Sequence, residues 1–110
     1  MNIRDFIEGP FVLLTNPQTL DNTFLGVYAT DLLSAAIKSA QPNDLLITII
    51  SHANTIGVAM MLDLSGVIVA EDRPVSEAML EKANEENIAI LKTPLMTHQV
   101  IQWMVHRGLL

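Results

Sequence analysis

Two consecutive segments of this chain repeat one pattern, in which a short apolar run leads through a polar break into an amphipathic stretch. The first run is Leu45–Ile50 and breaks at SHAN, residues 51–54; the second is Gly66–Ala70 and breaks at EDRP, residues 71–74. Continuous apolar runs of this length are typical of parallel strands covered on both faces. The repeated pattern therefore predicts βαβ units in a single α/β domain with a mainly parallel sheet and helices packed around it.

The periodicity of apolar residues predicts the other elements. Further strands are expected at residues 11–15, 24–29 and 88–91, the first two as edge strands of either direction. Residues 16–22 are expected to form a turn-rich connection. Helices are expected at residues 2–8 and 32–40, from Asn54 or Thr55 to about 64, after Ser76, and at 97–106. Asp31, Ser76 and Thr97 are the predicted N-caps, and Asn87 and Gly108 the predicted helix ends.

The composition indicates one folded domain, over residues 1–110, that associates with copies of itself. Half of the residues are hydrophobic and 16% are charged, which excludes a disordered chain. The segments 56–62 and 100–105 are apolar on more sides than one buried face requires. Because monomers rarely expose such surfaces, we expect a homo-oligomer, a dimer or larger.

Charge and residue usage exclude several classes of function. The net charge is −6, from 12 acidic and 6 basic residues without a Lys/Arg cluster, so neither nucleic acid nor an anionic membrane is an expected partner. The chain has no cysteine, which excludes disulfides, thiol catalysis and thiolate zinc sites. No signal peptide and no apolar run of transmembrane length is evident, so a cytoplasmic protein is expected.

Polar side chains follow the predicted strands at their carboxyl ends, where open α/β sheets bind ligands. The candidate ligand-binding residues are Asp31, Ser51, His52, Asn54, Glu71, Asp72, Arg73 and Thr93. Arg73 and the N–H groups at two helix starts favour an anion such as a phosphate, carboxylate or nucleotide group, whereas the acidic residues oppose it. The alternative interpretation is that these residues only cap helices and form turns.

Other chemistry finds less support in the sequence. His52 and its acidic neighbours lack a recognised metal-ligand spacing, and Ser51 directly before His52 does not have the geometry of an activated nucleophile. No phosphate-binding loop of the G-x-x-x-x-G-K-[ST] type occurs. We therefore predict no catalytic residue, no metal and no cofactor.

A family resemblance rests on particular residues. The stretch of Tyr28, Asp31, Leu32, Leu33 and Ser34, then His52 and Asn54 in the turn after an apolar strand, resembles small DRTGG-domain proteins. Residues 66–104 are similar in element order to DRTGG domains and to the N-terminal domain of HPr kinase/phosphorylase. The resemblance covers about residues 24–108. It departs at the namesake motif, since Asp-Arg falls at His52-Ala53 and Thr-Gly-Gly falls at Ala70-Glu71-Asp72.

The resemblance implies an accessory role. DRTGG domains occur beside phosphotransacetylase catalytic domains and with CBS domains, and they are not known as catalysts in isolation. We therefore expect a non-catalytic regulatory or ligand-sensing module that binds a small anionic metabolite or nucleotide at the strand ends. The main alternative is a pure protein–protein interaction or oligomerisation module. A metal-binding protein and a cryptic enzyme are the remaining alternatives.

Overall fold

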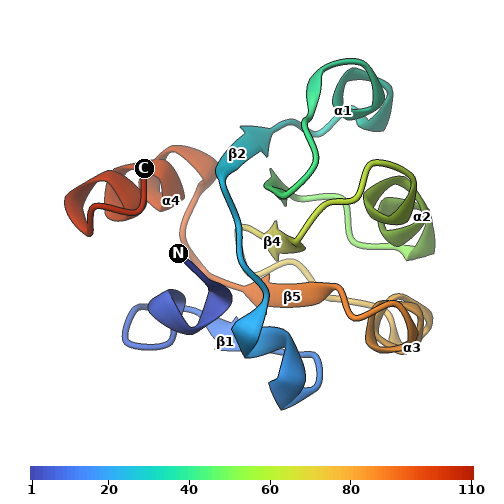
Figure 1. Cartoon of the computed structure of the whole chain (residues 1–110), viewed down its shortest axis with the longest axis horizontal. Helices are drawn as coiled ribbons and strands as arrows, with labels where there is room; N and C mark the ends of the chain where they lie inside the picture. The colour runs from blue at the N-terminus through green and yellow to red at the C-terminus, as the bar shows by residue number, and fades with distance from the viewer.

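Five strands form one sheet in the order β1-β5-β4-β3-β2 in the computed structural model, which describes residues 1–110 (Figure 1). The strands are β1 (Val12–Leu13), β2 (Gly26–Ala29), β3 (Asp44–Thr48), β4 (Gly66–Val69) and β5 (Ala89–Lys92). Strands β2 to β5 run parallel, while β1 pairs antiparallel with β5. The predicted mainly parallel α/β sheet is confirmed, with one edge strand of each direction.

Helices cover both faces of this sheet. They are α1 (Leu33–Ser39), α2 (Ala53–Met61), α3 (Glu77–Glu85) and α4 (Thr97–His106), with 3₁₀ helices η1 (Ile3–Phe6) and η2 (Pro17–Asp21). Figure 1 shows α1, α2 and α3 on one side of the sheet, and α4 with the N-terminal segment on the other. None of these helices has the length and apolar character that crossing a membrane requires.

The side chains of the strands alternate between two apolar clusters, one on each face. Along β3, Leu45 and Ile47 join the cluster under α4, whereas Leu46 joins the cluster under α1, α2 and α3. The α4-side cluster is rich in aromatic rings and includes Phe6, which is fully buried. This two-sided burial explains why the central strands have no polar alternation in their sequence.

Of the three predicted N-cap residues, one is confirmed and two are wrong. Ser76 caps α3 as predicted, since its Oγ accepts a hydrogen bond from the Met79 N–H at 3.2 Å. Asp31 does not cap α1: its carboxylate accepts from the Ile49 N–H at 3.0 Å and serves the end of β3 instead. Thr97 is also not a cap, because it is the first residue of α4 and follows the N-cap Met96.

The boundaries of other elements differ modestly from the predictions. Helix α2 begins at Ala53, one residue before the predicted start, and ends at Met61. The connection at residues 16–22 contains η2, which Pro17 favours because its fixed φ suits the first turn of a helix. Asn87 and Gly108 have φ of 55° and 71°, so both terminate helices in the left-handed conformation as predicted.

Candidate functional site

The predicted ligand-binding residues all lie in segments that leave the carboxyl ends of the parallel strands. Because β2, β3, β4 and β5 are parallel neighbours, these segments share one edge of the sheet, which we call the carboxyl edge. No hollow on the protein surface is lined by any of the eight predicted residues. The carboxyl edge is therefore an open surface without a pocket.

Two of the predicted residues have side chains that hydrogen-bond to other groups of the protein. Thr93 is fully buried, and its hydroxyl donates to the Pro10 carbonyl at 2.7 Å and accepts from the Leu95 N–H at 3.2 Å. The Asp31 carboxylate accepts from the Ile49 N–H and from the Thr48 hydroxyl, the latter at 3.2 Å. Both residues hold the loops of the carboxyl edge in place, Thr93 from the interior and Asp31 from an exposed position.

The turn after β3 leaves a series of hydrogen-bond donors open. The N–H groups of Ser51 through Asn54 donate to no acceptor in the protein, and the first bond of the helix is that of the Thr55 N–H to the His52 carbonyl at 2.9 Å. His52 holds the N-cap position of α2 but provides no side-chain cap. The start of α2 therefore offers four free donors and the positive end of a helix dipole.

The turn after β4 has an unusual backbone. Glu71 and Asp72 both have positive φ, 59° and 53°, in the left-handed region that favours glycine. Their N–H groups donate to the carbonyls of Leu95 and Thr93 at 2.9 and 2.8 Å, which ties this turn to the loop after β5. These two positions are those at which the resemblance places Gly-Gly, and here Glu71 and Asp72 adopt the left-handed conformation without glycine.

Lys92 is a charged residue of this edge that the sequence analysis missed. Its Nζ lies 3.5 Å from the Asp72 carboxylate. The Arg73 guanidinium lies 3.8 Å from the Glu71 carboxylate. With Asp31, the edge carries three acidic and two basic side chains, a formal charge of −1. Since two of the acids have basic partners, the repulsion expected between this edge and an anion is reduced. Lys92 falls one residue past the predicted strand 88–91, directly before Thr93.

The alternative chemistries find no ligand set or catalytic pair here. Histidine and carboxylate side chains nowhere form a group of three that could hold a metal ion. The Ser51 hydroxyl has no hydrogen bond to the imidazole of His52. The carboxyl edge therefore shows no serine–histidine pair of the kind that activates a nucleophile.

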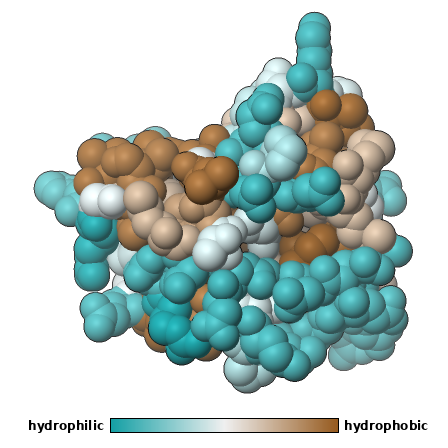
Figure 2. Space-filling model, in the orientation of Figure 1, coloured by the Kyte–Doolittle hydropathy of each residue, from teal (hydrophilic) through white to brown (hydrophobic).

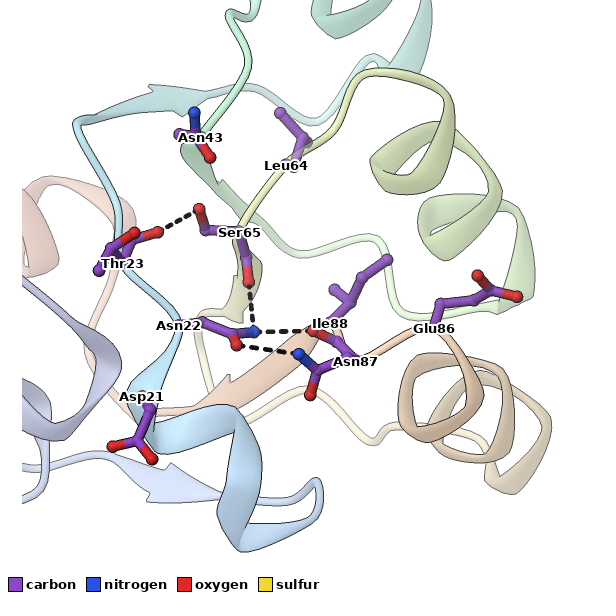
Figure 3. A pocket seen from close by; sticks show the side chains of 9 residues that line it. All are labelled: Asp21, Asn22, Thr23, Asn43, Leu64, Ser65, Glu86, Asn87 and Ile88. Atoms are coloured by element: carbon purple, nitrogen blue, oxygen red, sulfur yellow. Dashed lines mark hydrogen bonds between the residues drawn. The ribbon is translucent and has the colours of Figure 1, made fainter.

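A second polar region lies at the opposite, amino edge of the sheet, in a hollow of about 360 Å³ (Figure 3). The Asn22 amide donates to the carbonyls of Asn87 and Ser65, at 2.7 and 3.3 Å, and accepts from the Asn87 amide at 3.2 Å. The Ser65 hydroxyl donates to the Thr23 carbonyl. These groups bond to one another, so their hydrogen bonds join the N-terminal segment to the residues that precede β4 and β5. No local motif marks it, because its members are far apart in the sequence.

Replacing Glu71 with glycine is expected to stabilise the protein. A non-glycine residue in the left-handed region costs about 1–2 kcal/mol, and glycine gives back part of this through its freer unfolded chain. The lost ion pair with Arg73 is solvent-exposed and contributes little. The free energy of unfolding should therefore rise by about 0.5–1 kcal/mol, measured by urea denaturation.

Glu81→Gly is the matched control, because Glu81 is exposed on α3 with ordinary helical geometry. There the same change should destabilise the protein by about 0.5–1 kcal/mol. A loss of stability in both variants would show that the turn after β4 does not hold Glu71 in a strained conformation.

Comparisons with known proteins agree with this architecture. A model of the DRTGG domain family matches residues 11–107. Among solved structures, the chain is similar to the CBS and DRTGG domains of the regulatory region of Clostridium perfringens pyrophosphatase, complexed with its activator diadenosine tetraphosphate, with a TM-score of 0.64 and 20% identity. The match covers 74% of this chain and 35% of that one, so it spans about a third of the larger protein's chain. No protein of curated function matches the sequence.

Proposed function

This chain belongs to the DRTGG domain family, and from that premise we propose that it is a non-catalytic regulatory module that senses a small anionic metabolite or nucleotide. The observation that carries the proposal is the run of four unpaired N–H groups at the start of α2. The similar pyrophosphatase regulatory region, which holds a nucleotide activator, supports this class of ligand.

The start of α2 suits an anion better than the start of α3. At α3, the Ser76 hydroxyl already accepts from the Met79 N–H. At α2, no side chain competes for the donors, so a phosphate or carboxylate would receive several hydrogen bonds along the helix dipole. In this proposal the ligand contacts His52, Asn54 and the Ser51 hydroxyl.

The remaining predicted residues have supporting roles in this proposal. Arg73 adds positive charge for the ligand, and Asp72 is a further contact from the turn after β4. The left-handed Glu71 and the internally bonded Asp31 and Thr93 hold the backbone of the carboxyl edge in position.

His52→Asp is the variant that tests this site most directly. A carboxylate at the N-cap should accept from the open N–H groups, stabilise the free protein by about 0.5–2 kcal/mol and exclude an anion from the same place. Thermal unfolding is followed with inorganic phosphate, AMP, ATP and diadenosine tetraphosphate. We expect one of these to stabilise the wild type, by about 2.7 kcal/mol at 100 times its Kd, and to have no effect on His52→Asp.

His52→Ala is the matched control, since it removes the imidazole and leaves the N–H groups open. It should retain part of the stabilisation by the ligand. The proposal fails if none of the four compounds stabilises the wild type, or if the stabilisation is the same in His52→Asp as in the wild type.

We further propose that the module is a homo-oligomer. Several large apolar side chains are exposed in the single chain, among them Leu25 at 82%, Met61 at 60% and Val105 at 58%. Exposed apolar area of this kind in a small domain supports association with another chain. Sedimentation of the wild type should therefore show a dimer or larger species, and a monomer at all concentrations up to about 500 μM would contradict the proposal.

A further inference from the structure

Helix α4 is apolar on two sides and has a neighbour on only one of them. Val100 and Met104 are fully buried against the sheet. Val105 points away from the core and is 58% exposed, and Ile101 is only partly covered. Beside them lies a hollow of about 580 Å³ lined by Ile101, Gln102, Val105 and His106. The outer side of α4 therefore has the shape and composition of a surface that another helix would cover.

Helix α4 carries no acidic residue, a property that it shares with α1 and α2 in this acidic chain. All 12 aspartates and glutamates lie at or before Glu86, so α4 carries none. Figure 2 shows a hydrophobic area over α4, whereas the surface around α3 is hydrophilic. One carboxylate lies close to the end of α4: that of Glu8, which is 3.7 Å from the guanidinium of Arg107. Two copies with net charge −6 repel each other least where acidic side chains are absent.

We propose that a second copy of this chain covers the outer side of α4, with the two α4 helices packed against each other about a two-fold axis. In such an interface the same patch serves both subunits, so it must be complementary to itself. Ile101 and Val105 provide the apolar contact, and Gln102 can donate to and accept from its own copy. This assignment rests on the homo-oligomer proposed above and specifies its interface.

A second hydrophobic area is less suited to this role. Figure 2 shows it over α1 and α2, where Leu32, Ile37, Met60 and Met61 are exposed. Asp31 directly precedes Leu32, and Asp63 lies two residues after Met61. Pairing of two such areas would bring carboxylates together, which opposes association.

The size of α4 sets the expected strength of the interface. Its ten residues make it about 15 Å long at 1.5 Å per residue. A pair of such helices forms a contact below the standard size of about 800 Å² per partner. Association is therefore expected at micromolar rather than nanomolar concentrations, and experiments should cover about 1–500 μM.

Single cysteines test the arrangement, because the chain contains no cysteine of its own. Gln102→Cys places one thiol in the middle of the outer side of α4, and mild oxidation should give a covalent dimer in high yield. Ser34→Cys on α1 tests the competing hydrophobic area, and Glu81→Cys on α3 reports random collisions; both residues are exposed. We expect little cross-linking in these two variants.

Val105→Glu provides the second measurement. It introduces one carboxylate per subunit into the acid-free contact, and its exposed position lets the subunit fold, which circular dichroism verifies. The dissociation constant from sedimentation equilibrium should rise at least about tenfold. Ile37→Glu, at a residue 47% exposed on α1, is the matched control and should leave it unchanged.

The outcomes separate the two proposals. A wild type that is monomeric at every concentration overturns both the homo-oligomer and the α4 interface. If the wild type does associate, either of two results overturns the α4 interface alone. One is that Ser34→Cys cross-links and Gln102→Cys does not. The other is that Val105→Glu self-associates as tightly as the wild type.

Discussion

Phe6→Ala is expected to lower the free energy of unfolding by about 3–5 kcal/mol, the range for removing a large aromatic side chain from a core. Phe6 is completely buried at the centre of the aromatic cluster. Its ring centroid lies 5.0 Å from that of Phe11, 5.7 Å from Phe24 and 5.5 Å from Trp103. Alanine would lose all three ring contacts and leave a cavity between the sheet and α4. Urea denaturation measures the change.

The neighbouring Ile7→Ala is the control for this prediction. Ile7 is 45% exposed and lies outside the cluster, so its loss should cost less than about 1 kcal/mol. Similar losses in the two variants would mean that the N-terminal segment does not pack as described. Because domains of this size are stable by only about 5–15 kcal/mol, Phe6→Ala is expected to leave a barely folded protein.

Phe6 belongs to an N-terminal segment that packs beside α4 on one face of the sheet. The family match begins at residue 11, whereas Ile3 and Phe6 lie before it and are almost fully buried. They pack in the same cluster as Val100 and Met104 of α4. The N-terminal segment and α4 thus cover one sheet face together, and the outer side of α4 depends on that support for its position.

Gly9→Ala is expected to destabilise the protein by about 1–3 kcal/mol through overpacking. A Cβ at residue 9 would lie 2.3 Å from Cζ2 and 2.7 Å from Cε2 of Trp103. The indole cannot easily move away, since Phe6 stacks on it and Phe11 packs edge-on at 4.8 Å. Either the ring or the backbone must shift, and calorimetry should show a lower melting temperature.

Gly57→Ala carries the same substitution into an opposite environment. Apart from its chain neighbours and the backbone of its own helix, no atom lies within 4 Å of a Cβ at residue 57, which is within α2. Alanine is favoured over glycine in a helix by about 0.5–1 kcal/mol, so this variant should melt higher than the wild type. A gain from Gly9→Ala would show that Trp103 is free to move and that the aromatic cluster is loosely packed.

Much of the fold could be predicted because its signals are local. The apolar runs that became β3 and β4 are short, bounded by polar breaks, and buried on both sides. Ser76 and Asn87 lie at the two ends of α3, where their chemistry predicts a cap and a left-handed terminator. Each of these features depends on neighbours within a few residues, which a single sequence displays directly.

The role of the site residues was harder to predict because it depends on distant partners. Asp31 has the chemistry of an N-cap, yet it bonds to the backbone at the end of β3, 18 residues away. Thr93 donates across 83 residues to Pro10. The ion pair between Lys92 and Asp72 likewise forms only when β4 and β5 lie side by side.

The amino-acid sequence by itself determined the order of strands and helices, the parallel sheet and the edge that gathers the polar turns. Tertiary structure decided which of those polar groups stay open: packing buries Thr93 and engages Asp31, and it leaves the donors of Ser51 to Asn54 free. It also decided that Trp103 lies inward on Phe6 while Val105 stays exposed. The physical reason is that periodicity reports a residue's own helix or strand, whereas hydrogen-bond satisfaction and burial depend on what packs against it.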